Sequence, residues 1–439
     1  MLNKMSIKFG SAPHFFWLAL VFTWSLLRPG GAHAQGGSTL TLEQCYQRAE
    51  AAYPLSRQRG LIAKTREYTL ENISRGIYPQ FSINGSATYQ SDVTKIVLPP
   101  IPGFNFQIPT VSKDQYKLYG EVSQTLSDFG INRQKREISR TDAELQEENL
   151  NTQLYQLKDR INQLFFGVLL LDGQLEQNDL SKQDIRTGIS RVQAAIANGT
   201  DFNSSLNKLK AELLKTDQHS IDLKASRKAY MDMLSLFIDQ PVDDRTVLVK
   251  PEPPVLSDSI RRPELRTYDL QAKSYQQQQH LTKINNYPQL SAFFQGGFGK
   301  PSPVNLLSTD VTGYYLTGLR LSWNFGGLYT YKKDRLINEN NQEMVLAQRN
   351  TFLFNTSMTL RQKNADIDRY RQLIASDNEI VQLRDSVKAT SAVQLQNGVI
   401  NANDYLIDIN AGAQARQDRV LHEVQLLIAE YDHKTTAGN

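Results

Sequence analysis

The sequence predicts an α+β membrane protein. Long antiparallel coiled-coil helical hairpins are expected to form an α-barrel, and four transmembrane β-strands per chain are expected to contribute to an oligomeric β-barrel. Three observations support this fold class: apolar residues at heptad spacing over very long stretches, four strands of alternating polarity, and two internal repeats. A length of 439 residues accommodates two such repeats.

The composition excludes several classes of protein. The chain has 49 Lys and Arg against 45 Asp and Glu, and three of the basic residues lie in the first 34 positions, so 46 remain beyond them. This near balance argues against a nucleic-acid partner. A single cysteine excludes a disulfide framework and a cysteine-built metal site.

The first element is an expected signal peptide over residues 1–34. Lys4 and Lys8 precede an apolar stretch from Phe15 to Leu27, and Ala32-His33-Ala34 has the small-x-small pattern of a cleavage site. The mature chain would begin near Gln35. The alternative is a membrane anchor helix, but the apolar stretch is short and Pro29-Gly30-Gly31 interrupts it.

The remaining chain contains two similar halves. Tyr78-Pro79-Gln80 recurs as Tyr287-Pro288-Gln289, and Asn198-Gly199 has a counterpart in Asn397-Gly398. Because the landmarks keep one order, we expect a first repeat over 35–239 and a second over 262–439. The intervening segment 240–261 is rich in proline and is expected to be a linker with at most one short strand.

Each half is expected to contain two long helices, at about 131–197 and 202–238 and then at about 328–396 and 402–433. In the first half, apolar residues recur at steps of four and three, as in Leu150, Leu154, Leu157, Ile161, Leu164 and Val168. The second half has a seven-residue stripe from Leu346 to Leu395, with Lys388 as the exception. A helix from 132 to 196 would be roughly 100 Å long.

Four strands are expected at about 79–91, 115–127, 288–299 and 314–325. Polar and apolar residues alternate in each, with aromatic residues near the ends, as in transmembrane strands. An ordinary half-buried sheet of a soluble protein is the alternative that alternation leaves open. Four strands cannot close a barrel in lipid, so several chains would have to pool their strands.

These residues resemble the TolC family of outer-membrane efflux proteins. Leu40-Thr41-Leu42-Glu43-Gln44 is similar to the opening helix of that family, and Arg262-Pro263-Glu264-Leu265 is similar to the same opening in the second repeat. Val122-Ser123-Gln124-Thr125-Leu126 with Phe129-Gly130 resembles the strand-to-helix junction of the family. The resemblance covers residues 38–433.

The resemblance implies a homotrimeric channel-tunnel in the cell outer membrane, with its helical part in the periplasm and its strands in contact with outer-membrane lipid. It also implies a periplasmic adaptor protein and an inner-membrane pump as partners, most simply of the resistance–nodulation–division type. The expected function is export of small molecules such as drugs or metal ions. The outer-membrane component of type I protein secretion is an alternative function.

The resemblance also assigns site residues. The hairpin tips that would dock the adaptor contain Gly199, Asp201, Gly398, Asn401, Asp404 and Leu406. For the two glycines, turn formation is an expected role in any case. Arg384 and Asp385 lie about four turns before Gly398 and are expected to constrict the periplasmic entrance, or else to belong to a solvated coiled-coil face.

The sequence contains no motif of a catalytic, metal or cofactor site. The histidines are not spaced as ligands on one helix face, and no phosphate-binding loop or nucleophile elbow is present. We therefore expect neither an enzyme nor a cofactor. A secreted coiled-coil scaffold is a further alternative, which would explain the heptads but not the four strands.

Overall fold

The computed structural model describes residues 39–94, 103, 110–243, 245–306 and 309–439. The expected signal peptide lies outside the described residues, as does most of the proline-rich segment between the first two strands. Contacts group the described residues into one unit, Thr39–Asn439.

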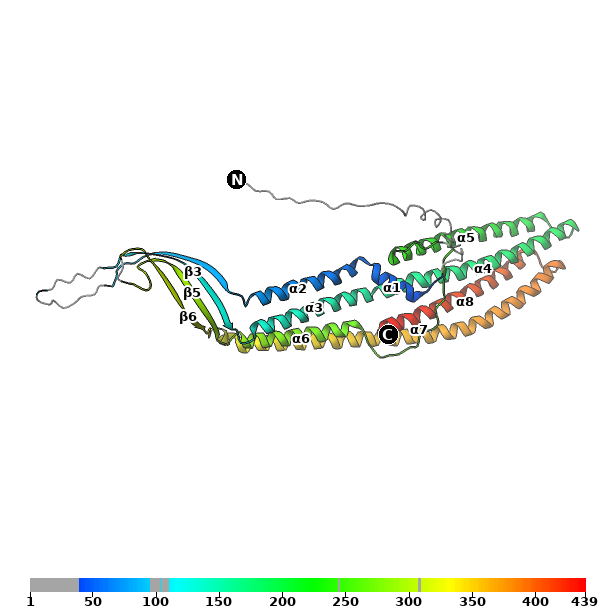
Figure 1. Ribbon diagram of the computed structural model, residues 1–439. Coiled ribbons are helices and arrows are strands. Elements are labelled where there is room, and N and C mark those ends of the chain that lie inside the picture. Colours follow the sequence, from blue (N-terminus) through cyan, green and yellow to red (C-terminus); the bar gives the residue numbers. More distant parts are fainter. Residues whose placement is uncertain (1–38, 95–102, 104–109, 244, 307–308) are drawn as a thin grey trace, which may run out of the picture. The chain divides into compact units, whose positions relative to one another are not determined.

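Long helices make up most of the unit (Figure 1). In chain order they are α1 Leu42–Ala52, the 3₁₀ helix η1 Pro54–Arg57, α2 Gln58–Arg75, α3 Ile131–Tyr155, α4 Leu157–Ala197, α5 Asn203–Ile238, α6 Pro263–Ile284, α7 Gly327–Gln396 and α8 Ala402–Ala437. The 70 residues of α7 form one uninterrupted helix about 105 Å long.

The strands form two sheets. β1 Thr39–Leu40 and β4 Val247–Leu248 are a short parallel pair. β2 Gln80–Tyr89, β3 Asp114–Ser127, β5 Gln289–Lys300 and β6 Thr312–Ser322 form an antiparallel sheet in the order β2-β3-β5-β6. The two hairpins, one from each half of the sequence, are thus joined by the β3–β5 pair.

The element order repeats within the chain. In each half a helix leads into a β-hairpin, and the hairpin is followed by long helices that reverse direction at an Asn-Gly pair: α2-β2-β3-α3-α4-α5 in the first half and α6-β5-β6-α7-α8 in the second. The long helix of the first half differs from the expectation of one continuous element. It is divided into α3 and α4 at Gln156, which keeps helical backbone angles, with φ −65° and ψ −15°.

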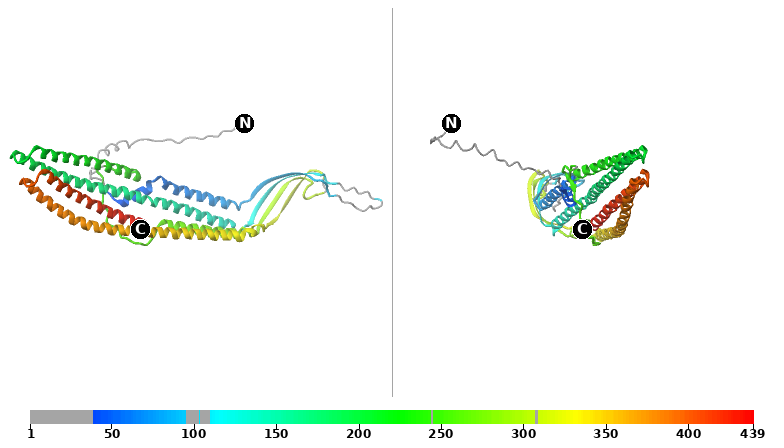
Figure 2. Two further views of the ribbon diagram at one scale, coloured as in Figure 1. Left: turned by 180° about the vertical axis from the view of Figure 1, so that it is seen from behind. Right: turned by 90° about the vertical axis from the view of Figure 1, so that its right-hand side faces the viewer.

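The helices pack in two groups. α2, α3, α6 and α7 lie side by side next to the four-stranded sheet, whereas α4 packs on α5 and α8, and α8 packs on α7, further along (Figures 1 and 2). The heptad seam of α4 is buried as expected, including Ile161, Val168 and Ile185. The α7 stripe is buried only from Leu360 onward. Leu346 remains exposed, because α8 does not extend that far.

A cluster of large side chains fills the centre of the unit. Phe165 and Phe166 on α4 are fully buried and pack with Met231 and Leu234 of α5 and Cys45 of α1. The β1–β4 pair contributes Leu40 and Leu248 to the same cluster, so the segment between the two halves is tied to the helices. Burial raises the pKa of the Cys45 thiol to about 12, which keeps it protonated and unreactive.

Two structural boundaries differ from those expected. β6 ends at Ser322, so Trp323 and Phe325 follow the strand instead of belonging to it. The indole Nε1–H of Trp323 donates to the carbonyl oxygen of Asn286 at 2.9 Å, which holds the ring at the end of α6. α8 continues to Ala437, four residues beyond its expected end.

Glycine permits a close approach between α4 and α8. A Cβ atom at Gly188 would lie 2.5 Å from the ring of Tyr405, which is 2% exposed and therefore cannot move aside. On the same helix, a Cβ at Gly167 would lie 3.5 Å from the ring of Tyr230, an ordinary contact. The two glycines therefore provide a matched pair.

We expect Gly188→Ala to lower stability by about 1–3 kcal/mol, since overpacking outweighs the better helix propensity of alanine. Gly167→Ala should raise stability by about 0.5–1 kcal/mol through propensity alone. Denaturant unfolding of the purified protein measures both. Equal shifts of the same sign in the two variants would contradict the packing described for α4 and α8.

Candidate functional site

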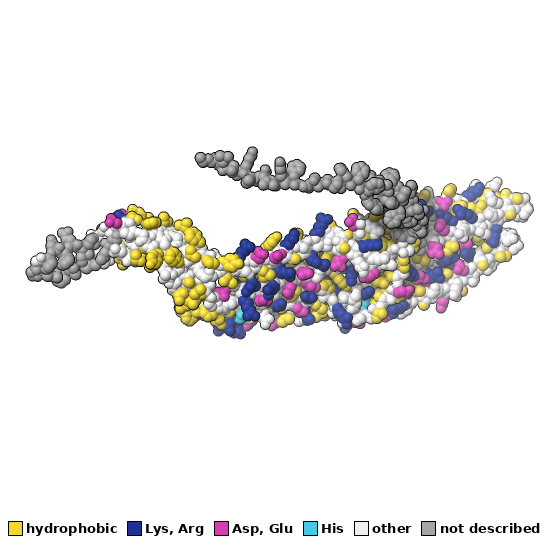
Figure 3. Space-filling view, in the orientation of Figure 1, with side chains coloured by type: hydrophobic (Ala, Val, Ile, Leu, Met, Phe, Trp, Pro, Cys, Tyr) yellow, Lys and Arg dark blue, Asp and Glu magenta, His cyan; other side chains and the backbone are white. Residues whose placement is uncertain are grey.

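One face of the four-stranded sheet is apolar. The strand register places Phe81 beside Val122, and Val122 beside Phe294, so alternate residues of β2, β3 and β5 share this face. β6 adds Tyr315, Leu319 and Leu321. These side chains are exposed, for example Phe81 at 69% and Leu319 at 68%. Figure 3 shows the apolar side chains gathered over the sheet. An exposed apolar patch of this kind is typical of a surface that contacts a membrane or another protein.

The opposite face of the sheet is polar. Arg320 Nη1 lies 2.8 Å from Glu121 Oε1, and the Gln295 amide donates to Glu121 at 2.5 Å. The Arg320 guanidinium also lies over the Phe293 ring at 4.6 Å. Glu121 of the first half and Arg320 of the second half thus pair across the sheet.

The two outer strands of the sheet have unpaired edges. β2 pairs only with β3, and β6 pairs only with β5, in the described part of the chain. β2 and β6 present ten and eleven residues with one free edge each. Because the apolar face lies beside these edges, their free N–H and C=O groups are in a position where water cannot satisfy them if the face is in lipid.

The helical hairpins turn at the predicted glycines. Gly199 has φ +72° and Gly398 has φ +70°, the left-handed conformation that glycine adopts without a Cβ clash. Thr200 N–H donates to the Ala195 carbonyl at 2.9 Å, and Val399 N–H donates to the Gln394 carbonyl at 2.8 Å. Both turns are therefore Schellman motifs with the same bonding pattern.

The other predicted tip residues have identifiable local contacts. Asn401 Oδ1 caps α8 by accepting the N–H groups of Asn403 at 2.8 Å and Asp404 at 3.1 Å. Asp201 accepts the Phe202 N–H at 2.6 Å. Leu406 packs against the apolar cluster formed by Ile185, Leu209 and Ile409. Asp404 lies in the first turn of α8, where a carboxylate is favoured by the helix dipole.

Two exposed apolar residues at the tips were missed by the sequence analysis. Phe202, just before α5, is 78% exposed, and Val399, just after Gly398, is 69% exposed. The sequence feature that could have indicated them is one apolar residue within a polar turn, three positions after Gly199 in the first hairpin and directly after Gly398 in the second. Side chains of this kind do not stabilise the isolated chain.

The predicted constriction residues have different environments. Arg384 is exposed, and in the described residues it has no ion pair. Asp385 belongs to a network: its carboxylate lies 2.6 Å from Arg416 Nη1 of α8, and Lys388 Nζ lies 3.0 Å from Asp184 of α4. Arg416 also approaches Asp184 at 3.5 Å. The network joins helices from both repeats, and it explains why Lys388 occupies an apolar heptad position.

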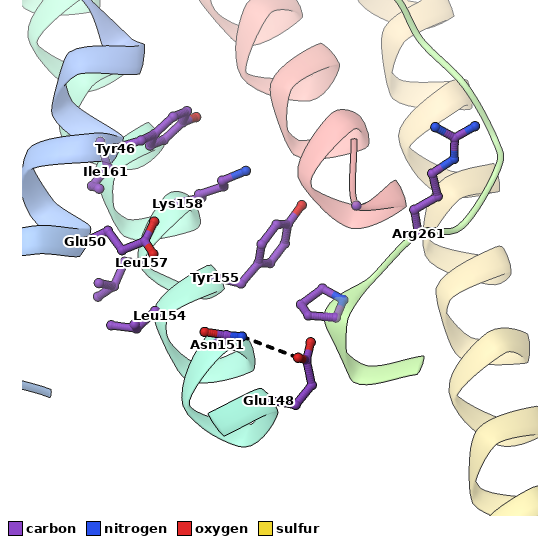
Figure 4. Close-up of a pocket in the computed structure, with 12 residues that line it drawn as sticks. Tyr46, Glu50, Glu148, Asn151, Leu154, Tyr155, Leu157, Lys158, Ile161 and Arg261 are labelled. Carbon is purple, nitrogen blue, oxygen red and sulfur yellow. Dashed lines mark hydrogen bonds between the residues drawn. The ribbon is translucent and has the colours of Figure 1, made fainter. Parts of the chain in front are cut away.

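A cavity of about 340 Å³ lies where α3 meets α4 (Figure 4). The Lys158 ammonium lies between the rings of Tyr155, at 4.6 Å, and Tyr46, at 5.6 Å. Burial lowers the pKa of Lys158 and raises the pKa of Tyr155 to about 12. The two carboxylates of the wall are paired elsewhere, Glu50 with Arg59 and Glu148 with Arg266.

Among the described residues, no helix is both long and apolar enough to cross a membrane. No group of three or more histidine, cysteine, aspartate or glutamate side chains there is arranged to hold a metal ion.

The ion-pair network yields a prediction. Arg416 is 7% exposed and neutralises Asp184 and Asp385 together with Lys388, so Arg416→Ala leaves the two carboxylates with one cation instead of two. The loss should be about 1–2 kcal/mol, less than for breaking a fully buried pair, because Lys388 remains and Asp385 is half-exposed. Arg419→Ala, which removes an i,i+4 pair with Glu423 on the same helix, should cost at most about 0.5 kcal/mol. Denaturant unfolding compares the two variants, and equal losses would argue against the network.

Solved structures with the same architecture identify the fold. OprN, an outer-membrane channel, is 14% identical, with a TM-score of 0.64 over 90% of this chain and 89% of its own. The outer membrane protein VceC from Vibrio cholerae is 15% identical, with a TM-score of 0.62 over 91% and 96%. The outer membrane channel MtrE from Neisseria gonorrhoeae is 14% identical, with a TM-score of 0.63 over 91% and 89%.

No protein-family model and no curated protein sequence matches the chain. At these low identities the structural likeness concerns the fold alone. The chain therefore has the fold of outer-membrane channels, as its resemblance to the TolC family predicts.

Proposed function

We propose that this protein is a trimeric channel-tunnel of the outer membrane that exports small molecules to the cell exterior. The observation that carries the proposal is the four-stranded sheet: it has one exposed apolar face and two unpaired edges, and it leads directly into long helices. This combination argues against a soluble scaffold, because an exposed apolar sheet with free edges promotes aggregation in water.

The free edges favour assembly with copies of the same chain. The β2 edge of one chain can pair with the β6 edge of the next, and such pairing closes only when the sheets form a ring. The trimer is proposed from the resemblance to the TolC family. In such a ring the apolar face would turn to the lipid, and the face with Glu121, Gln295 and Arg320 would line the lumen.

The helices support the same assembly. Near the sheet, α2, α3, α6 and α7 form a single layer in which α7 is an outer member. One side of α7 exposes four large apolar side chains, Ile337, Met344, Phe354 and Met358. This side could pack against a helix of the next chain. Layers joined edge to edge would form a tube that continues the barrel.

The hairpin tips are proposed to contact a periplasmic adaptor that connects the channel to an inner-membrane pump. Phe202 and Val399 support this role, because both are large, apolar and exposed at the ends of the two hairpins. Gly199 and Gly398 fix the shape of the turns that present them. Arg384, which is exposed in the single chain, and Asp385 are proposed to narrow the entrance of the assembled tube.

We expect the mature protein to begin near Gln35, to fractionate with the outer membrane, and to migrate as a detergent-stable trimer that heating dissociates. Reconstitution into a planar bilayer should then give stepwise ion conductance. Extraction without detergent as a soluble coiled coil would contradict the proposed function, as would a mature chain that retains residue 20.

Replacing Gly199 or Gly398 by valine should abolish export while leaving the outer-membrane level normal. The local cost is about 1–2 kcal/mol for a left-handed valine, which is small beside a seam of buried leucine and isoleucine side chains. The turn would still change shape, so adaptor cross-linking at the tip should be lost. Asparagine tolerates the left-handed conformation, so Gly199→Asn and Gly398→Asn should retain export. Normal export by the valine variants would remove the tips from the docking surface.

A further inference from the structure

Six basic side chains lie where the sheet meets the helices, and we name this group the basic belt. Its members are Arg133, Lys135, Arg136, Lys283, Lys332 and Lys333. None of them has an ion pair within the part of the chain that the structure describes. Two nearby carboxylates pair with other cations, Glu137 with Arg140 at 2.8 Å and Glu339 with Arg335 at 2.7 Å. Asp334 follows Lys333 in α7 and forms no ion pair with the basic belt. Figure 3 shows basic side chains following the apolar band of the sheet.

The basic belt lies at the depth of lipid headgroups if the sheet spans a bilayer. Arg133, Lys135 and Arg136 lie two to five residues into α3, about 3–8 Å along the helix. Lys332 and Lys333 lie about 8–9 Å into α7. The headgroup layer on each side of a bilayer is about 5–7 Å thick, and a lysine side chain can extend to reach it. Aromatic residues mark the boundary itself, with Phe129 in edge contact with Tyr287 and Trp323 beside Phe325.

These cations occupy positions that a helix by itself disfavours. α3 and α7 both begin at the sheet, and neither has an acidic residue in its first turn. The amino end of a helix carries a partial positive charge, so basic residues there raise the electrostatic energy unless an anion is close. Asp128 does not supply that anion to the side chains, because its carboxylate accepts the N–H groups of Gly130 and Asn132. The six cations of the basic belt therefore have no ion pair among the described residues.

The basic belt presents cations on both faces of the helical layer. A cavity of about 370 Å³ between α2 and α3 is lined by Lys135 and by Leu281 of α6. A second cavity, of about 490 Å³, is lined by Lys283 and Arg335. Leu281 and Lys283 are about 200° apart around α6, so the two cavities open on different faces. Lys332 shares the side of Arg335, and Lys333 points about 160° away from it. One face thus carries Lys283 and Lys332, and the other carries Lys135. Lys333 lies on the side of α7 that also exposes Ile337 and Met344, at the outer edge of the layer.

We propose that the basic belt binds the phosphate groups of acidic phospholipids in the leaflet nearest the helices. This inference rests on the proposed function, because it requires the sheet to span a membrane. A lipid is favoured over a nucleic acid, since the cations adjoin an apolar sheet face and the rest of the chain is close to neutral. Only one face of the helical layer can be turned to lipid. We therefore expect that either Lys283 or Lys135 selects the acidic lipid and that the other does not.

Trp323 provides a probe at the right depth. Trp323 is the one tryptophan of the mature chain expected to begin near Gln35, because Trp17 and Trp24 lie in the expected signal peptide. The mature protein is reconstituted into vesicles, and quenching of Trp323 fluorescence is compared for brominated phosphatidylglycerol and brominated phosphatidylcholine. We expect an approximately tenfold preference for the acidic lipid at low salt, which weakens as salt is added.

Two matched variants compare the two faces. Lys283→Gln and Lys135→Gln each remove one charge, from opposite faces of the helical layer. One variant should lower the preference for the acidic lipid several-fold, and the other should retain it. Equal quenching by both lipids in the unsubstituted belt, or equal losses in both variants, would overturn the inference.

Two further outcomes distinguish failure of the lipid-binding inference from failure of the proposed function. Inorganic phosphate at constant ionic strength should not displace the acidic lipid, and efficient displacement would mean a free-phosphate site instead. If neither brominated lipid quenches Trp323, the sheet is not in the bilayer, and the proposed function fails with the inference. Quenching by both lipids without preference leaves the proposed function intact and removes only the lipid-binding role of the basic belt.

Discussion

Backbone hydrogen bonding at the edges of the four-stranded sheet is the constraint on which the rest of the structure depends. β2 and β6 each have a free edge beside an exposed apolar face. In lipid, an unpaired N–H or C=O group costs several kcal/mol, so a strand edge of ten residues requires a partner strand. In the proposed membrane assembly, copies of the chain would supply the partner strands, and the helices attached to those strands would be brought together with them.

The helices are stabilised by a different interaction from the one that links the strands. Their stability comes from burial of a heptad seam in water, and Phe165, Phe166 and Val168 are fully buried near the centre of the unit. The sheet instead leaves its large side chains exposed. The helical part of the chain therefore buries its large apolar side chains within the chain, whereas the sheet leaves its large apolar side chains exposed to the surroundings. The junction between them, at Gly130 and Gly326, is where aromatic and basic side chains gather.

Charged groups connect the two repeats in both parts. In the sheet, Glu121 of the first half pairs with Arg320 of the second. Among the helices, Asp184 of α4 lies close to Lys388 of α7 and Arg416 of α8. Ion pairs of this kind add modest stability but fix which side chains face each other. These ion pairs hold the two repeats in one register, whereas apolar seams alone would allow the helices to pack in several registers.

The sequence by itself determined the element types, the duplicated order and the turns. Heptad spacing and strand alternation are local periodicities, and a left-handed glycine is a local requirement, so Gly199 and Gly398 could be recognised without any tertiary information. Only the tertiary structure decided that Lys388 pairs with Asp184, that Leu346 stays exposed while Leu360 is buried, and that Phe202 and Val399 lack partners at the tips. These features depend on where a neighbouring helix ends and which residues, two hundred positions away, lie opposite. Local periodicity contains no information about either, because many registers of two long helices bury the same seam.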